Sequence, residues 1–489
     1  MKLQFILGRP GTGKTTYCYS EIAAMQEEKD DDSALILIVP EQFSFQSEKA
    51  LLAATPRGAI SRARVLSFNR LFYFVLSKTG GLGRATLENS GKNMVLRKIV
   101  GGLDKQLGYY KSAKDAKGFL DSLSTSITEF YHYDITPDTL EQKIRAADGA
   151  LALKLTDLHL IYSNYKNFLE ENFISSDEVL DILAEKIPKA DFLQNACIWI
   201  DGFKSFTPQE ARVLAALLRM AKQVKIALPS PKRLADFSEI SKGGVNQEVV
   251  ETMEKIQQMV LEAGAAFDEP QVLTHQHRHK NAPDIAFLCQ NFLSIRNVKF
   301  ADVPQNIRIA PAENIFDEID AAARLVTTLT RDRGYKYSEI GIIATNLAEY
   351  EKFVPAMFAR YHIPVFVDAR RGILSHPLVD LVFAACQVIY TNWNYESVFR
   401  MLRLPIFDCR EEIDILENYV LAYNIRGKTT WQKDFAYGDE DELAALNPLR
   451  QRVYDVLAPL HEKFTPRRKY ILKNFATAIY NFLIQIDAP

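Results

Sequence analysis

Hydrophobic residues near the start of the chain form short, wholly apolar runs bounded by turn residues. Residues 3–7 form one run, which leads into a glycine-rich loop and then a helix beginning near Lys14. Runs at 34–39 and 64–67 continue the rhythm. Short apolar runs separated by helical segments are typical of buried strands in a parallel sheet covered by helices. The pattern therefore predicts an α/β domain at the N-terminus.

Between residues 89 and 193 the hydrophobic spacing becomes that of helices. One stripe consists of Phe119, Leu123, Ile127 and Phe130. A second consists of Leu151, Leu155, Leu158, Tyr162, Tyr165 and Leu169. Such stripes are the core faces of amphipathic helices. Strand-length runs return at 196–200 and 223–228. We therefore predict one α/β domain over 1–88 and 194–290, interrupted by a helical insertion over 89–193.

A second α/β pattern follows, without a glycine loop. It predicts strands at 307–310, 339–344 and 365–367. Helical spacing lies between them, at 316–330 and 349–360. We expect a second, incomplete α/β domain over 291–380 and a helical segment over 381–489. The last residues follow an apolar helix without a finishing element, so we expect the chain to be part of a longer protein.

The composition limits the class of protein. A chain of 489 residues is too long for one hydrophobic core, and 47% hydrophobic with 25% charged residues is typical of a globular protein. The net charge of −2 neither supports nor excludes nucleic-acid binding, because a local patch suffices. The five cysteines are scattered without a CxxC pair, and no apolar run approaches the ~20 residues of a membrane span. We expect a cytoplasmic protein that does not cross a membrane.

The strongest motif is the loop at residues 8–15, which follows the pattern G-x-x-x-x-G-K-[ST] between a strand and a helix. Its glycines let backbone N–H groups surround phosphates, and the helix N-terminus adds partial positive charge. Lys14 would reach the β- and γ-phosphates, and Thr15 would bind Mg²⁺. The predicted nucleotide-binding residues are Gly8, Gly11, Thr12, Gly13, Lys14, Thr15 and Thr16.

Hydrolysis would also need two acidic residues at the end of a nearby strand, one for Mg²⁺ and one to polarise water. Asp201 follows the strand at 196–200 and is the candidate for the Mg²⁺ side, but Gly202 stands where the second carboxylate is expected. The strand at 223–228 ends in Pro-Ser-Pro, with no polar sensor for the γ-phosphate. We predict a site that binds ATP and Mg²⁺ but hydrolyses ATP weakly. The alternative that Asp201 only opens a turn stays open.

Two segments that follow neighbouring strands, 40–45 and 65–73, combine amide, hydroxyl, basic and aromatic side chains. Both should open on the carboxyl edge of the sheet, where ligands bind. Rings stack on bases, Arg70 can contact phosphate or guanine, and Gln42 can contact a base edge. The mixture favours single-stranded nucleic acid. The alternative is that the aromatic residues belong to the core: Phe43, Phe45, Phe68 and Phe72.

Together these segments resemble a known family. The runs GRPGTGKT, IVPEQFSFQSEKALL, RARVLSFNRLFYFVLSKTGG and IDGFKSFTPQE are similar to AddB, also called RexB. This is the B subunit of the bacterial ATP-dependent helicase–nuclease that processes double-strand breaks for recombination. In the second α/β pattern, FDEIDAAARLV, YSEIGIIATN and FARYHIPVFVDARRGILSHPLVDLV extend the resemblance over essentially the whole chain.

The resemblance implies a P-loop NTPase fold with the superfamily-1, UvrD-like helicase architecture: two RecA-like parallel-sheet domains with helical insertions. In the family an AddA-type partner unwinds DNA as part of a heterodimer. The B subunit holds the 3′-ended strand and scans it for a recombination hotspot. By position, the residues that match the strand-binding channel are Gln42, Ser44, Phe68, Arg70 and Tyr73. Phe203 and Phe206 are weaker candidates.

The chain departs from the family pattern in what it lacks. The family's nuclease motif and the cysteines that hold its 4Fe-4S cluster are not found and would lie beyond residue 489, as would late helicase motifs. We therefore expect no catalytic residues, nuclease activity or unwinding in this piece. Arg278 and Arg370 or Arg371 are interpreted as surface arginines rather than as phosphate sensors or strand contacts. Two alternatives stay open: a stand-alone phosphate-loop ATPase or kinase, and a non-catalytic scaffold with a vestigial loop.

Overall fold

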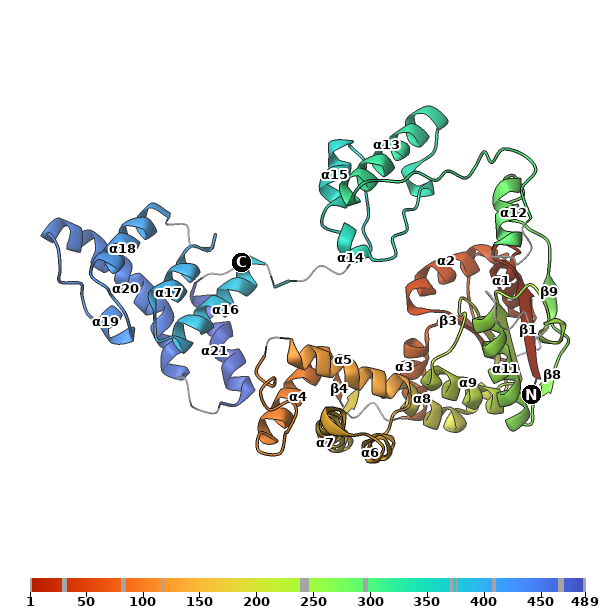
Figure 1. Cartoon of the computed structure of the whole chain (residues 1–489), viewed down its shortest axis with the longest axis horizontal. Coiled ribbons are helices and arrows are strands. Elements are labelled where there is room, and N and C mark those ends of the chain that lie inside the picture. Colours follow the sequence, from red (N-terminus) through yellow and green to blue (C-terminus); the bar gives the residue numbers. More distant parts are fainter. Residues whose placement is uncertain are drawn as a thin grey trace. The chain divides into compact units, whose positions relative to one another are not determined.

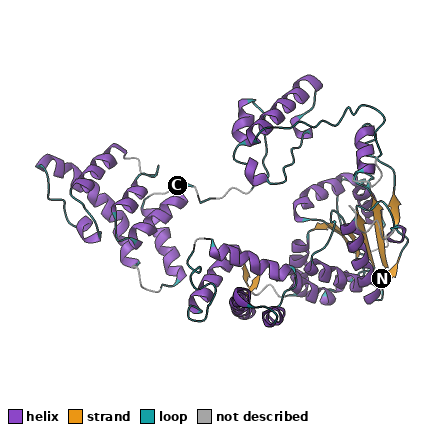
Figure 2. Cartoon of the chain, in the orientation of Figure 1, coloured by secondary structure: helices purple, strands orange, loops and turns teal. Residues whose placement is uncertain are grey.

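The computed structural model describes residues 2–28, 33–80, 85–116, 118–237, 246–292, 298–369, 373–374, 376–406, 410–464 and 470–486. The chain forms two compact units, Met1–Ile309 and Ala310–Pro489, which are described separately (Figure 1). The described strands lie in the first unit, whereas the described elements of the second unit are helices (Figure 2).

The first unit is built on a seven-stranded sheet in which the recorded pairings are all parallel. The strand order is β3-β2-β6-β7-β1-β8, and β9 also pairs with β1. The strands are β1 (Lys2–Gly8), β2 (Leu35–Ile38), β3 (Ala63–Leu66), β6 (Cys197–Ile200), β7 (Gln223–Leu228), β8 (Ala266–Phe267) and β9 (Gln271–Leu273). The five longer strands confirm the sequence prediction. The last two were not predicted, because two or three residues are too few to show a pattern.

Alternate side chains of the strands enter two cores, one on each face of the sheet. On one face Leu37 and Trp199 belong to the same core as Cys18 and Ile22 of the first helix. On the other face Ile38 joins the larger core. The first face is covered by α1 (Lys14–Glu27) and α2 (Ser44–Ala54), and the second by α3 (Phe68–Thr79), α8 (Val179–Lys186), α9 (Pro208–Met220) and α11 (Gln247–Glu262). Burial on both faces explains why the strands are apolar throughout.

The segment between α3 and α8 folds mainly into helices with a core of their own. Its elements are β4 (Ala85–Leu87), α4 (Asn89–Gly102), α5 (Phe119–His132), α6 (Pro137–Arg145), α7 (Gly149–Asn172) and β5 (Phe173–Ser175), with β4 and β5 paired in parallel. Leu123 and Ile127 are buried in this core, as the first stripe predicted. The second stripe is fully buried only from Leu158 onward, since Leu151 is 55% exposed in the first turn of α7.

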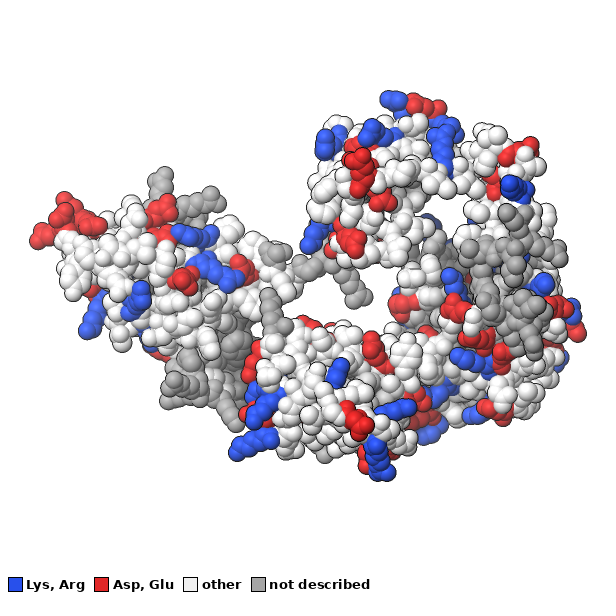
Figure 3. Space-filling model, viewed as in Figure 1, with Lys and Arg blue, Asp and Glu red and all other residues white. Residues whose placement is uncertain are grey.

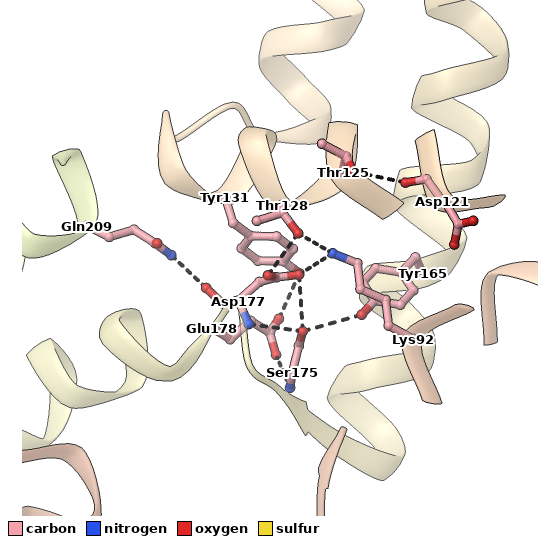
Figure 4. Close-up of polar contacts among 10 residues, drawn as sticks. All are labelled: Lys92, Asp121, Thr125, Thr128, Tyr131, Tyr165, Ser175, Asp177, Glu178 and Gln209. Atoms are coloured by element: carbon pink, nitrogen blue, oxygen red, sulfur yellow. Dashed lines mark hydrogen bonds and ion pairs between the residues drawn. The ribbon is translucent and has the colours of Figure 1, made fainter. Parts of the chain in front are cut away.

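A buried polar network joins this insertion to the core that contains the sheet (Figure 4). Lys92 of α4 is fully buried, forms an ion pair with Asp177, and donates a hydrogen bond to Thr128 Oγ1 at 2.6 Å. Thr128 donates to Asp177 at 3.1 Å. Gln209 of α9 donates to the Asp177 carbonyl oxygen at 2.8 Å. A buried charge is tolerated when it is paired and hydrogen-bonded, so the network fixes α4 and α5 against α9.

Short helical elements connect the larger ones in the first unit: η1 (Glu41–Phe43), η2 (Ile187–Lys189), η3 (Asp191–Leu193) and η4 (Leu234–Asp236). After β9 the chain passes beside the glycine-rich loop, where the backbone N–H of His277 donates to the Gly11 carbonyl oxygen at 3.0 Å. It then forms α12 (Pro283–Asn291).

The described part of the second unit is helical and has two hydrophobic cores. The smaller core includes Ile319 of α13 and Phe358 of α15, and the larger one is centred on Trp393, Trp431 and neighbouring helices. The elements are α13 (Ile315–Arg333), η5 (Tyr337–Glu339), α14 (Leu347–Tyr350), α15 (Val354–Arg360), α16 (Pro377–Tyr390), α17 (Tyr395–Leu402), α18 (Arg410–Ala422), α19 (Lys428–Gln432), α20 (Glu440–Lys463) and α21 (Leu472–Gln485).

The prediction of three strands at 307–310, 339–344 and 365–367 is wrong, because the described residues form no strand there. Their apolar side chains point to solvent instead: Ile309 is 93%, Ile343 98% and Phe366 87% exposed. A parallel strand exists only through hydrogen bonds to partners distant in sequence, and these segments pair with none among the described residues. The expected helices at 316–330 and 349–360 do form, although the second is divided between α14 and α15. None of the helices in the described ranges is long and apolar enough to cross a membrane.

Candidate functional site

The glycine-rich loop lies between β1 and α1, at the carboxyl edge of the sheet. It turns through Gly11 and Gly13, whose φ angles of 85° and 88° place both in the left-handed region. A Cβ atom on Gly8 would lie 2.3 Å from Thr12 Oγ1 and 2.8 Å from the Leu273 carbonyl oxygen, so this position has no room for a side chain. The spacing of glycines in the motif is thus required by the backbone.

Lys14 is held by carbonyl groups of its own loop. Its Nζ donates to the carbonyl oxygens of Gly8 at 2.7 Å and Arg9 at 3.2 Å. Burial lowers the pKa of Lys14 below its ordinary value of 10.5; the charge of Asp201 opposes this effect and that of Arg278 adds to it. Within the described part of the chain no carboxylate bonds directly to this ammonium group, and this environment favours an anionic ligand.

Thr15, at the start of α1, and Asp201, directly after β6, meet at the same edge of the sheet, although β7 lies between β1 and β6. Thr15 Oγ1 donates to Asp201 Oδ2 at 2.6 Å, and Asp201 is buried, with 8% exposure. A hydroxyl and a carboxylate side by side are oxygen donors of the kind that Mg²⁺ prefers. These two residues therefore fit the predicted Mg²⁺ position next to bound phosphates.

The backbone at Gly202, where a second acidic residue is expected, disfavours any residue with a side chain. Its φ angle is 88°, and a Cβ atom would lie 3.0 Å from Pro40 Cδ. Residues other than glycine are disfavoured in this backbone region. At the position where a second acid is expected, the backbone therefore has a conformation that favours glycine.

A cavity of about 560 Å³ lies against the loop. Five predicted nucleotide-binding residues line it: Gly11, Gly13, Lys14, Thr15 and Thr16. The other two support the loop, since Thr12 is 4% exposed and donates to the Arg9 carbonyl oxygen at 2.9 Å, and Gly8 leaves space for it. Lys204 and Arg278 also line this cavity, and Asp201 is the single acid among its lining residues. The excess of positive charge suits a polyphosphate.

The interpretation of Arg278 as a surface arginine is only partly right. Arg278 is exposed, but it lines both the loop cavity and a second cavity of about 530 Å³, which also contains Thr15, Asp201 and Gly202. The sequence held no signal for this placement, because residues 277–278 reach the loop only through backbone hydrogen bonds to Gly11. Arg370 and Arg371 lie outside the described residues.

Several predicted strand-binding residues gather at the ends of β2, β3 and β6. The Phe203 ring contacts that of Phe68 edge-on at 5.5 Å and stacks on that of Phe206 at 5.3 Å. Gln42 and Arg70 are exposed. Tyr73 is 49% exposed on α3 and Phe68 is 6% exposed, so Phe68 is mainly a core residue. Ser44 is also buried, and its hydroxyl donates to the Glu41 carbonyl oxygen at 2.9 Å, which supports the turn.

Sequence reasoning missed Glu41, which organises this surface. Its carboxylate lies 3.5 Å from Arg70 Nε and accepts a short hydrogen bond from Ser67. Ser67 is also the N-cap of α3, accepting from the Arg70 backbone N–H at 3.2 Å. On the face drawn in Figure 3, positive and negative side chains are interspersed.

A third cavity, of about 340 Å³, lies where the insertion meets this edge of the sheet. Phe68 and Phe203 line it together with polar residues that sequence reasoning missed, among them Asn69, His132 and Gln209. His132 belongs to α5 and Gln209 to α9. No sequence pattern could join them, because they meet only through the packing of the insertion.

The fold and the loop define an α/β protein with a parallel sheet and a phosphate-type loop after its first strand, an arrangement consistent with a RecA-like domain. Residues 5–288 match the family model for the N-terminal region of AddB. This match covers more than half of the chain, and the chain belongs to the AddB family.

Full-length relatives agree with this assignment. The chain is 36% identical to the B subunit of the ATP-dependent helicase/deoxyribonuclease of Clostridium tetani, covering 100% of the chain and 44% of the relative. It is 32% identical to the protein of that name from Clostridium novyi (99% and 43% covered). It is 35% identical to that from Desulforudis audaxviator (91% and 38% covered). The chain spans less than half the length of these relatives.

Proposed function

We propose that this chain is the helicase-like, nucleotide- and single-stranded-DNA-binding part of the B subunit of a helicase–nuclease that processes double-strand breaks. The observation that carries the proposal is the juxtaposition at one sheet edge of the loop cavity and an aromatic, amide and basic surface. Asp201, directly after β6, accepts a hydrogen bond from Thr15 of the loop site, and Phe203 of the aromatic surface follows it two residues later. This arrangement suits a superfamily-1, UvrD-like helicase body.

The nucleotide role rests on the loop. Lys14, Arg278 and Lys204 would neutralise phosphates, while Thr15 and Asp201 would hold Mg²⁺ through the bound nucleotide. Bound Mg²⁺ would neutralise phosphate charge. Gly202 offers no group to orient or polarise an attacking water, and Pro229 follows β7 in place of a polar sensor. The site is therefore proposed to bind ATP with little hydrolysis.

The DNA role rests on the exposed groups beside the cavity. Tyr73 offers a ring for stacking, Arg70 a guanidinium group for phosphate, and Gln42 an amide for a base edge. The ion pair between Arg70 and Glu41 is exposed, and such pairs stabilise by only ~0–1 kcal/mol. A DNA phosphate can therefore compete for Arg70. In the whole protein we propose that this surface scans the 3′-ended strand for a hotspot, with an AddA-type partner supplying the motor.

Binding of a labelled single-stranded oligonucleotide, followed by fluorescence anisotropy over a salt series, tests the DNA role. We expect tighter binding than to duplex DNA, with affinity falling as salt rises. Tyr73→Ala should weaken binding roughly fivefold or more, and Arg70→Ala should reduce the salt slope by about one. Arg57→Ala is the matched control, since Arg57 is also an exposed arginine of the first unit. Equal affinity for both DNA forms, unchanged by either variant, would refute this role.

Titration with a fluorescent ATP analogue and Mg²⁺ tests the nucleotide role. Lys14→Ala should weaken binding by roughly 10- to 150-fold, the equivalent of ~1.5–3 kcal/mol for a hydrogen bond to a charged group. Steady-state ATP hydrolysis without DNA that disappears in Lys14→Ala would instead favour a stand-alone ATPase or kinase. Oligonucleotide binding without any nucleotide binding at millimolar concentration would favour a scaffold with a vestigial loop.

A further inference from the structure

Arg9 lies inside the glycine-rich loop, yet it does not line the loop cavity. Its Nη1 donates instead to the carbonyl oxygen of Cys289 at 2.9 Å. Cys289 is in the last turn of α12, where carbonyl groups lack helical partners and the helix dipole is negative. The guanidinium group of the loop is therefore a C-terminal cap for α12.

The segment that leads into this helix is also attached to the loop. We call residues 274–292 the strap. The backbone N–H groups of His277 and Arg278 donate to the Gly11 carbonyl oxygen at 3.0 and 3.2 Å, and Gln276 Nε2 donates to that of Pro10 at 2.9 Å. A Cβ atom on Gly11 would lie 2.1 Å from Gln276 Oε1, so the glycine allows this close approach. The strap is thus fastened to the loop at both of its ends.

The strap in turn holds the connection to the second unit. Asp284, in the first turn of α12, is 4% exposed. Its carboxylate accepts hydrogen bonds from the backbone N–H groups of Gln305 at 2.9 Å and Asn306 at 2.7 Å, and from Asn306 Nδ2 at 2.9 Å. The first unit ends at Ile309, three residues further on. One helix therefore joins the glycine-rich loop to the exit of the chain from the first unit.

From these contacts we infer that the strap transmits nucleotide occupancy from the loop to residues 305–306, with Arg9 and Asp284 as its two positioning residues. The inference rests on the proposed binding of nucleotide. This inference assigns a role to a site that does not hydrolyse ATP. Bound ATP would act as a ligand that stiffens the segment around residues 305–306, and its hydrolysis would not be needed.

The direction of the effect follows from the charges around the cavity. Lys14 and Arg278 line the same cavity, and the positive charge of Arg278 lowers the pKa of Lys14, while the nearby Asp201 raises it. Phosphates between them would turn this repulsion into attraction and draw the strap toward the loop. Lys14 would at the same time exchange the carbonyl oxygens of Gly8 and Arg9 for phosphate oxygens. We expect bound nucleotide to tighten the strap and the clamp at Asp284.

Hydrogen exchange of the peptide 301–309, with and without a non-hydrolysable ATP analogue and Mg²⁺, tests the inference on the whole 489-residue chain. The amides of Gln305 and Asn306 report the clamp directly. We expect saturating nucleotide to slow their exchange about fivefold or more, the lower end of typical coupling between sites. If nucleotide binds without changing this exchange, the inferred role of the strap is refuted, whereas the proposed nucleotide site is not. No binding at all would overturn both.

Variants distinguish transmission from general stability. Compared at nucleotide concentrations that saturate each variant, Arg9→Ala should lose the slowing of exchange at residues 305–306. Arg9→Lys should restore part of it, because a lysine can still donate to the carbonyl oxygen. Asp284→Ala should exchange fast at these amides with or without nucleotide. Arg219→Ala, an exposed arginine on α9, is the control and should behave as the original chain. A nucleotide effect that survives in Arg9→Ala would refute the route through Arg9.

Discussion

The first unit contains two clusters that each combine a lysine, a threonine and an aspartate, but the side chains in the two clusters are bonded differently. In the loop site Lys14 bonds to carbonyl oxygens while Thr15 donates to Asp201 at 2.6 Å. In the insertion Lys92 forms an ion pair with Asp177 and donates to Thr128 at 2.6 Å. Each group has one lysine, one threonine and one aspartate.

The two clusters differ in whether the aspartate forms an ion pair with the lysine. Lys92 is fully buried and its charge is paired with Asp177, so it needs no further partner. Lys14 lines a cavity, and its aspartate bonds to the threonine instead. The same residue types therefore stabilise packing in one place and leave a cation available to a ligand in the other. Burial lowers the pKa of both lysines, so a lowered pKa does not by itself mark a binding site.

The largest effect that would test this contrast is on stability. Lys92→Met should destabilise the insertion by ~3–5 kcal/mol, because it leaves the carboxylate of Asp177 buried without its cation. Lys14→Ala should change stability far less, since its ammonium group has no buried carboxylate bonded to it. Urea-dependent hydrogen exchange of α4 and α5 measures the difference.

A second substitution separates the loss of the ion pair from the loss of packing. Lys92→Met combined with Asp177→Asn removes both charges and should recover much of the stability. If Lys92→Met and Lys14→Ala destabilise the unit equally, the distinction between a structural and a ligand-binding lysine is wrong.

A smaller effect concerns the absent acid of the loop site. Gly202→Glu should not create ATP hydrolysis, because the left-handed backbone and the nearby Pro40 prevent a normal side-chain placement. It should destabilise the first unit by ~1–2 kcal/mol, the cost of a left-handed conformation. Phosphate release and thermal unfolding are the measurements. Gly202→Ala is the matched control, with the same backbone cost and no carboxylate, and hydrolysis gained only by the glutamate variant would refute the prediction.

The smallest effect is on the pH dependence of nucleotide binding. Binding requires the charged form of Lys14, whose pKa lies below 10.5. Affinity should therefore decline as pH rises through that lowered pKa, before an ordinary lysine loses its proton. Titrations with the fluorescent ATP analogue from neutral to alkaline pH measure this decline. Lys14→Arg stays charged over the whole range and should show a flat profile, and a flat profile in the original chain would contradict the prediction.

A structural feature could be predicted from the sequence when it depends on residues close together in the chain, and not when it depends on contacts between distant segments. The five longer strands of the sheet and the turn of the glycine-rich loop between β1 and α1 were predictable, because each depends on a local pattern. The nucleotide-binding role of the loop residues and the consequence of Gly202 for hydrolysis remain predictions. The expected strands around 307–367 failed because strand pairing is decided by distant partners. The predicted bounds of the domains remain predictions.

The sequence by itself determined the glycine-rich loop, the strands that end beside it and the membership of the AddB family. Only the tertiary structure decided that Arg278 lines the cavity, that Ser44 and Phe68 are buried, and that Lys92 is neutralised while Lys14 is not. The physical reason is the same in each case. A residue's type and its neighbours in the chain set what its side chain can bond to, but burial and charge pairing depend on which remote segments the fold brings against it.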